Sequence, residues 1–227
     1  MNDSYPSTLS VLQHADSMFP SGAVSFSWGL EALCNRSIIV ESNRLFEFIS
    51  AHLLSRWSCL DRPIIAHAHA AGNNTSILTE LDRNLEAQSL STEQRLGSTQ
   101  MGGALLSVHA RTGTPGASNY IDLIARQQAF GHIPVIQGLI WRALGFSEKQ
   151  ALMMSAHGLC TGILGAAIRL SIIGHINAQV IHTRIVPVIE EVLLLPIPAP
   201  EDVHSFIPQI EIASMNHEND EIRLFIN

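Results

Sequence analysis

The sequence predicts an all-α fold: a single-domain, multi-helix bundle of about ten helices. Two capping boxes, Ser91–Gln94 and Ser147–Gln150, each open a run in which apolar residues recur at helical spacing. Clusters of glycine and proline separate such runs along the chain. Strand signals are weak, because few runs alternate between apolar and polar residues and no Asn-Gly hairpin turn occurs.

The boundaries of the individual helices follow from these breakers and from cap residues. Ser42 is a suitable N-cap for the run that contains Leu45, Ile49 and Leu53. The breakers lie at 19–22, 71–75, 112–116, 144–145, 174 and 196–200. From the N-terminus on, the predicted helices are 7–16, 24–35, 42–57, 61–71, 76–88, 92–110, 118–130, 133–144, 148–171, 175–195 and 207–217.

The chain is expected to form one helical domain, residues 1–210, with a C-terminal tail, residues 211–227, that belongs to the same domain. The tail follows a proline-rich break and mixes charged residues with Ile222, Leu224 and Phe225. Such a segment gains order by docking, so we expect it to bind a partner.

The composition favours a protein that binds other proteins in a reducing compartment. Of 227 residues, 46% are hydrophobic and only 15% are charged, which indicates extensive burial or apolar surface for a partner. The net charge of −7 disfavours nucleic acid and a polybasic membrane surface. Three cysteines without a CxxC pair indicate reduced thiols. The first six residues do not resemble a secretory signal, so we expect a cytoplasmic protein.

One stretch is apolar enough to raise the question of a membrane span. Residues 151–168 carry no formal charge, and Gly158 and Gly162 form a GxxxG spacing. Ser155, His157 and Thr161 interrupt the stretch, which favours a central buried helix.

No catalytic motif is recognisable, and the protein is predicted not to be an enzyme. Lys149 is the only lysine and lies in Phe-Ser-Glu-Lys-Gln, which excludes a P-loop. There is also no GxGxxG, GxSxG or HExxH motif. Asp16 and Glu31 could form a carboxylate pair, but turn capping and a partner contact are the favoured interpretations.

The eleven histidines keep a metal-binding interpretation open. His67 and His69 are two apart and would point in different directions on a helix. His175 and His182 could share a helix face but span about two turns. Scattered core and surface histidines are favoured over a metal site, although a transient metal contact stays open.

Segments distributed over nearly the whole chain resemble the UreF family of urease accessory proteins. They are, in order, Leu12–Gly22 with Ser27–Glu31, Arg95–Leu106, Gly131–Gly138, Ala167–Leu170 with Gly174 and Gln179, and Ile212–Glu218 with Arg223–Phe225. The sequence departs from the family pattern at Val24, Phe26 and Asn216, where an aromatic residue, a histidine and an arginine are usual.

The resemblance implies an all-helical homodimer without catalysis or a cofactor of its own. It implies that the protein bridges UreD (also called UreH) and the GTPase UreG. The assembly would dock on apo-urease and insert nickel in a GTP-dependent manner, with the ion in transit and not stably bound. Neither nucleic acid nor a membrane is expected as a partner. Two alternatives stay open: a stand-alone nickel- or metal-binding protein, and a small hydrolase using Asp16, His217 or Glu218.

The resemblance also suggests which residues bind partners. Pro20 and Gly22 would form a rigid turn, Gly29 would allow a close backbone approach, and Glu31 would lie on a partner-facing surface. Within the tail, Arg223 would make bidentate contacts and Phe225 would be an anchor in an apolar pocket. The remaining candidate partner-binding residues are Met215, His217 and Glu218.

Overall fold

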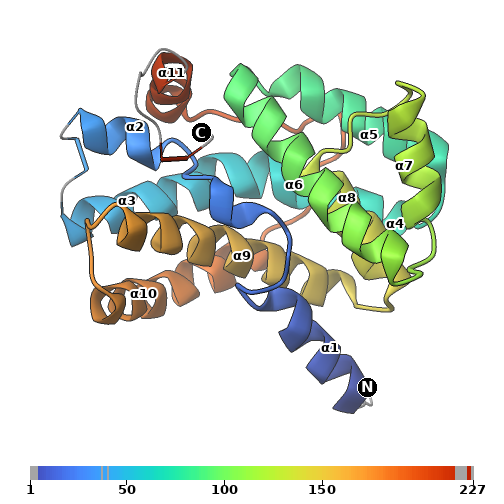
Figure 1. Ribbon diagram of the computed structural model, residues 1–227, viewed down its shortest axis with the longest axis horizontal. Helices are drawn as coiled ribbons and strands as arrows, with labels where there is room; N and C mark the ends of the chain where they lie inside the picture. Colours follow the sequence, from blue (N-terminus) through green and yellow to red (C-terminus); the bar gives the residue numbers. More distant parts are fainter. Residues whose placement is uncertain (1–4, 37, 40, 218–223, 226–227) are drawn as a thin grey trace.

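The computed structural model describes residues 5–36, 38–39, 41–217 and 224–225, and within them it contains helices and no strand, as predicted (Figure 1). The helices are α1 (Tyr5–Ala15), η1 (Ala23–Ser25), α2 (Leu30–Asn35), α3 (Ser42–His52), η2 (Leu53–Asp61), α4 (Arg62–Ala71), α5 (Thr75–Gln88), α6 (Thr92–Arg111), α7 (Ala117–Ala125), α8 (Ile133–Ala143), α9 (Glu148–Arg169), α10 (His175–Leu193) and α11 (Pro208–His217).

The predicted cap residues act mostly as expected. Ser147 and Gln150 form a complete capping box, in which each side chain accepts a hydrogen bond from the other's backbone N–H. The Ser91 hydroxyl accepts the backbone N–H of Gln94 at 3.1 Å. Ser42, in contrast, is the first residue of α3, and Glu41 occupies the N-cap position.

The core is built around α4, α8 and α9. Gly138 of α8 lies against α4 so closely that a Cβ atom there would be 2.5 Å from the Cβ of Ala68 and 2.7 Å from the Ile65 carbonyl oxygen. This glycine therefore sets the spacing of the two helices. Helix α9 is long and apolar enough to cross a membrane, but it packs against α1, α2, α4, α8 and α10, as the prediction of a buried helix requires (Figure 1).

Several predicted helices differ in their extent. The helices predicted at 42–57 and 61–71 are not separate, because the π-helix η2 directly joins α3 to α4. The helix predicted at 24–35 is interrupted, because Trp28 and Gly29 have φ angles of 55° and 82°, which an α-helix does not accommodate. The helix predicted at 118–130 ends at Ala125, because Gln127 also adopts a left-handed conformation, with φ 58°.

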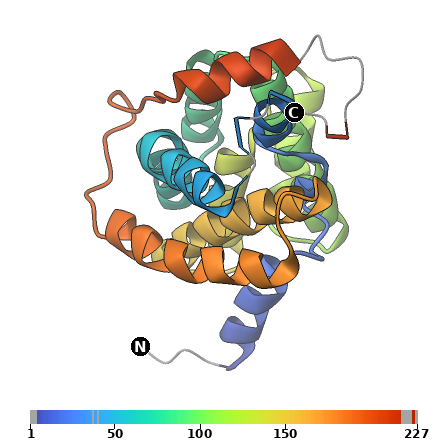
Figure 2. The ribbon, with the colours of Figure 1, turned by 90° about the vertical axis from the view of Figure 1, so that its left-hand side faces the viewer.

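The segment between α10 and α11 crosses the π-helix η2. The N–H groups of His204 and Phe206 donate to the carbonyls of Cys59 and Ser55, both at 3.1 Å. The buried Arg62 guanidinium donates to carbonyls at the end of α10 and the start of this segment. These contacts hold the segment that runs from α10 to α11, whose course is visible in Figure 2. Helix α11 spans the predicted boundary between residues 210 and 211, so the segment 211–217 is the end of a packed helix.

Candidate functional site

The predicted N-terminal turn follows α1 and is held by its own backbone and by stacked rings. The Asp16 carboxylate accepts the N–H of Met18 at 2.7 Å, so Asp16 caps the turn as predicted. The Phe19 ring packs on His14 and His109, with centroids 4.7 and 5.7 Å apart. These contacts hold the turn against the helical body.

Within this turn Pro20 and Gly22 are exposed. Gly22 has φ 76°, a conformation that favours glycine. Pro20 and Gly22 therefore occupy the turn that the sequence predicts, and their role in partner binding stays a prediction.

Glu31 lies inside the protein, where the sequence analysis expects it at the surface. The residue is 4% exposed, and its two carboxylate oxygens accept the N–H groups of Leu224 and Phe225 at 2.7 and 3.0 Å. Because these backbone groups come from the C-terminal segment of the same chain, Glu31 binds that segment in the absence of any partner.

Arg169 links the segment after the N-terminal turn to the C-terminal segment, a role that the sequence analysis does not assign. Its guanidinium donates to the Val24 carbonyl and lies 4.3 Å from the centroid of the Phe225 ring. Phe225 is buried in the core, which matches the expectation that it anchors the C-terminal segment in apolar surroundings. We call Glu31, Arg169, Leu224 and Phe225 the C-terminal latch.

Gly29 allows α11 of the same chain to approach α2, and its role in partner binding stays a prediction. A Cβ atom at Gly29 would be 3.2 Å from the Ser214 hydroxyl and 3.3 Å from a methyl group of Ile210. Helices α2 and α11 therefore lie side by side (Figures 1 and 2). Glu218 and Arg223 lie outside the described residues, and the placement of the His217 side chain is likewise outside them.

Two groups of exposed apolar side chains lie at opposite ends of the molecule. Leu9 and Leu12 of α1 are 65% and 62% exposed, and their spacing puts them on one face of the helix. Ile212 and Met215 have the same spacing on α11 and are also exposed, as is Leu224. In both views α1 and α11 lie far from one another (Figures 1 and 2). We call these groups the α1 surface (Leu9, Leu12) and the α11 surface (Ile212, Met215, Leu224).

A cavity of about 240 Å³ lies between the N-terminal turn and α6, α8 and α9. The Trp28 ring forms one wall and packs directly on Gly162, where a Cβ atom would be 2.2 Å from the ring. A second cavity of about 60 Å³ shares Trp28, Asp61 and Met101 with the first. Burial raises the pKa of Asp61, while the nearby Arg56, 3.5 Å away, opposes this shift. Both cavities are lined by the Asp61 carboxylate, and the larger, mostly apolar one is also lined by Asp16.

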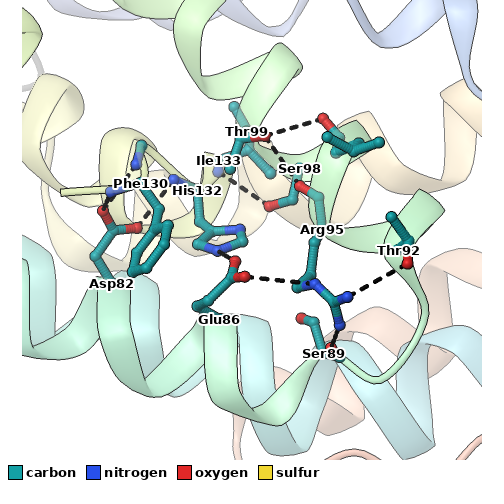
Figure 3. A network of polar contacts seen from close by, with 12 residues as sticks. Asp82, Glu86, Ser89, Thr92, Arg95, Ser98, Thr99, Phe130, His132 and Ile133 are labelled. Carbon is teal, nitrogen blue, oxygen red and sulfur yellow. Dashed lines mark hydrogen bonds and ion pairs between the residues drawn. The ribbon is translucent and has the colours of Figure 1, made fainter. Parts of the chain in front are cut away.

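A buried polar network connects α5, α6 and α8 (Figure 3). The Asp82 carboxylate accepts three consecutive backbone N–H groups, from residues 130, 131 and 132, at 2.7, 2.7 and 2.9 Å. The His132 ring contacts Glu86 at 2.8 Å, and Arg95 pairs with the other oxygen of Glu86 at 3.4 Å. Burial lowers the pKa of His132. This network holds α5, α6 and the segment before α8 together.

Of the two histidine pairs considered from the sequence, one behaves as expected and the other does not form. His67 and His69 bind the carbonyls of Pro198 and Phe146, both at 2.8 Å, so they point to different partners as predicted. His182 meets His157 of α9, not His175, with a nitrogen–nitrogen distance of 3.3 Å. The sequence did not show this pair, because it depends on the register between α9 and α10. Among the described residues no group of three or more His, Cys, Asp or Glu side chains is placed to hold a metal.

The described residues thus form an all-helical protein with an apolar surface at each end, a latch between its two terminal segments and a hydrophobic cavity at the centre. Comparison with known proteins identifies the family. The family model UreF matches residues 39–186. The chain belongs to the UreF family of urease accessory proteins.

Relatives in this family match over nearly their full length. The urease accessory protein UreF of Trichodesmium erythraeum (strain IMS101) is 33% identical over 234 residues, which cover 100% of each chain. UreF 1 of Brucella melitensis biotype 1 is 29% identical, with 99% of this chain and 94% of the relative covered. UreF of Bacillus sp. (strain TB-90) is 28% identical, with 96% and 98% covered.

Proposed function

We propose that this protein is a non-catalytic scaffold in urease maturation that bridges UreD/UreH and the GTPase UreG and promotes GTP-dependent nickel insertion into apo-urease. Membership of the UreF family supports a role in urease maturation, since the relatives are named urease accessory proteins. The observation that best supports bridging is the separation of the α1 surface from the α11 surface. A scaffold must hold two partners at once, and two distant apolar surfaces allow this without overlap.

The proposal includes a cytoplasmic homodimer that holds no resident metal. Nickel passes through the assembly as cargo. The Asp61 carboxylate, shared by both cavities, and the Asp16 carboxylate, in the lining of the larger one, offer oxygen ligands along such a route. Among the described residues no three or more His, Cys, Asp or Glu side chains gather to hold an ion, which suits transit more than tight binding. The hydrolase alternative has less support, because Asp16 is engaged in capping its turn.

The test is co-purification of the full chain with its cognate UreD/UreH and UreG, followed by size-exclusion chromatography with and without GTP and magnesium. One variant changes the α1 surface (Leu9→Asp, Leu12→Asp). A second changes the α11 surface (Ile212→Asp, Met215→Asp). A third ends after His217 and so keeps α11. The matched control is Ile77→Asp, an exposed aliphatic residue on α5.

The wild-type chain and the control should elute with both partners. The α1 variant should lose one partner and keep the other. The α11 variant should lose the second partner, because charge in an apolar interface is strongly unfavourable. The truncated chain should lose the same partner, because it lacks Leu224 of the α11 surface. If both surface variants lose the same partner, the surfaces form one interface and the bridging arrangement is wrong. If the folded wild-type chain elutes with neither partner, the scaffold function itself is wrong.

A further inference from the structure

The contact between His157 of α9 and His182 of α10 places two potential metal ligands next to one another. Nδ1 of His157 and Nε2 of His182 are 3.3 Å apart, and the rings meet edge to face with centroids 5.2 Å apart. Each residue lies in the interior of a long helix, α9 or α10, and the two helices pack against each other. The helices therefore set the separation of the two nitrogens.

This separation fits the geometry of a shared ion. With metal–nitrogen bonds of about 2.1 Å, two nitrogens 3.3 Å apart subtend an angle of about 104° at the ion. That angle lies between the tetrahedral value and the right angle of neighbouring octahedral ligands. In the observed contact one of these nitrogens donates its hydrogen to the other. When the donor ring takes its other tautomer, a modest rotation of the two rings directs both nitrogen lone pairs toward the ion.

The surroundings of His157 and His182 leave both imidazole rings accessible to a metal ion. Both rings are half-buried, so an ion and its water ligands can reach them from solvent. Imidazole nitrogen is a ligand that Ni²⁺, Zn²⁺ and Cu²⁺ all accept.

We propose that His157 and His182 together form a binding site for one divalent late first-row transition-metal ion, with water in the remaining positions. Two protein ligands make a weak, open site, from which the ion exchanges readily. The assignment of Ni²⁺ as the ion carried in the cell rests on the function proposed above, whereas the site itself rests only on the geometry of α9 and α10.

The test is isothermal titration of the purified full chain with NiCl2, and separately with CoCl2, whose visible absorption reports nitrogen ligation. The variants are His157→Ala and His182→Ala, and the matched control is His175→Ala, an exposed histidine at the start of α10. Loss of an outer-shell partner of a metal-bound histidine already weakens binding by about 10–100-fold, so removal of either ligand should weaken it at least tenfold. The control should bind like the wild type. Circular dichroism verifies that each variant is folded.

Two results would overturn the proposal: no saturable binding by the wild-type chain, or equal binding by the wild type and both histidine variants. The same variants, examined for co-elution with UreD/UreH and UreG, separate this proposal from the scaffold function. Lost metal binding with intact co-elution supports the site. Intact metal binding in the variants contradicts the site alone and leaves the scaffold function standing.

Discussion

His52 shows how burial turns a single residue into a pH sensor of stability. Its Nε2–H donates to the Trp28 carbonyl at 3.1 Å, beneath the strained backbone of Trp28 and Gly29. Burial, reinforced by the charge of Arg56, lowers the pKa of His52 from 6.5 to about 3. The folded protein therefore holds a neutral ring in a range of pH in which the unfolded chain holds a protonated one.

We expect the free energy of unfolding to fall as the pH falls from 6.5 toward 3, because the unfolded state then binds a proton that the folded state excludes. One such group contributes up to roughly 1.4 kcal/mol per pH unit. His52→Gln keeps a donor for the Trp28 carbonyl and cannot be protonated, so its stability should depend less on pH. Urea denaturation at pH 7.5, 6.0 and 5.0 measures this. A wild-type slope that matches that of His52→Gln, with His175→Gln as the exposed control, would contradict the expectation.

At the scale of elements, the packing of α11 against α2 places the C-terminal segment. Gly29 lets the two helices approach, and the C-terminal latch then ties the end of the chain to the N-terminal turn. The two hydrogen bonds that Glu31 accepts are charge-assisted, and bonds of this kind contribute about 1.5–3 kcal/mol each.

Loss of the Glu31 carboxylate should therefore release the C-terminal segment without unfolding the body. In Glu31→Ala, hydrogen exchange at the amides of Leu224 and Phe225 should accelerate by roughly 10- to 100-fold. Glu31→Gln retains one acceptor oxygen and should show an intermediate rate. Glu47→Gln, an exposed carboxylate of α3, is the control. Unchanged protection in Glu31→Ala would show that Arg169 and the core contacts of Phe225 suffice to hold the segment.

At the scale of the whole molecule, apolar side chains remain uncovered at both ends. A chain with 46% hydrophobic residues and 15% charged residues has little polar surface with which to cover them. We expect the isolated chain to bind a hydrophobic dye and to associate at high concentration.

Leu9→Ser with Leu12→Ser should lower both dye fluorescence and association. It should change the free energy of unfolding by less than about 0.5 kcal/mol, because these side chains are exposed in the folded protein. Dye titration and light scattering measure the first two quantities. If the variant bound as much dye as the wild type, the dye-binding apolar surface would lie elsewhere than on α1.

The fold class and most helices could be predicted because their signals are local. Apolar periodicity, the capping residues Ser91 and Ser147, and the glycine and proline breaks act within a few residues of one another. They identified α5, α6, α8, α9 and α10 nearly to their ends, but not the C-terminal limits of α3 and α7. The order of the family-like segments identified the UreF family.

Only the tertiary structure decided how distant residues meet. Glu31 meets the N–H groups of Leu224 and Phe225, separated from it by 193 and 194 positions. His157 meets His182 because of the register of two packed helices. The break at Trp28 is held by packing on Gly162 and by His52, neither of which is near it in sequence. Local patterns determine which residues form helices, whereas the direction of a buried side chain follows from packing energies that depend on the whole chain.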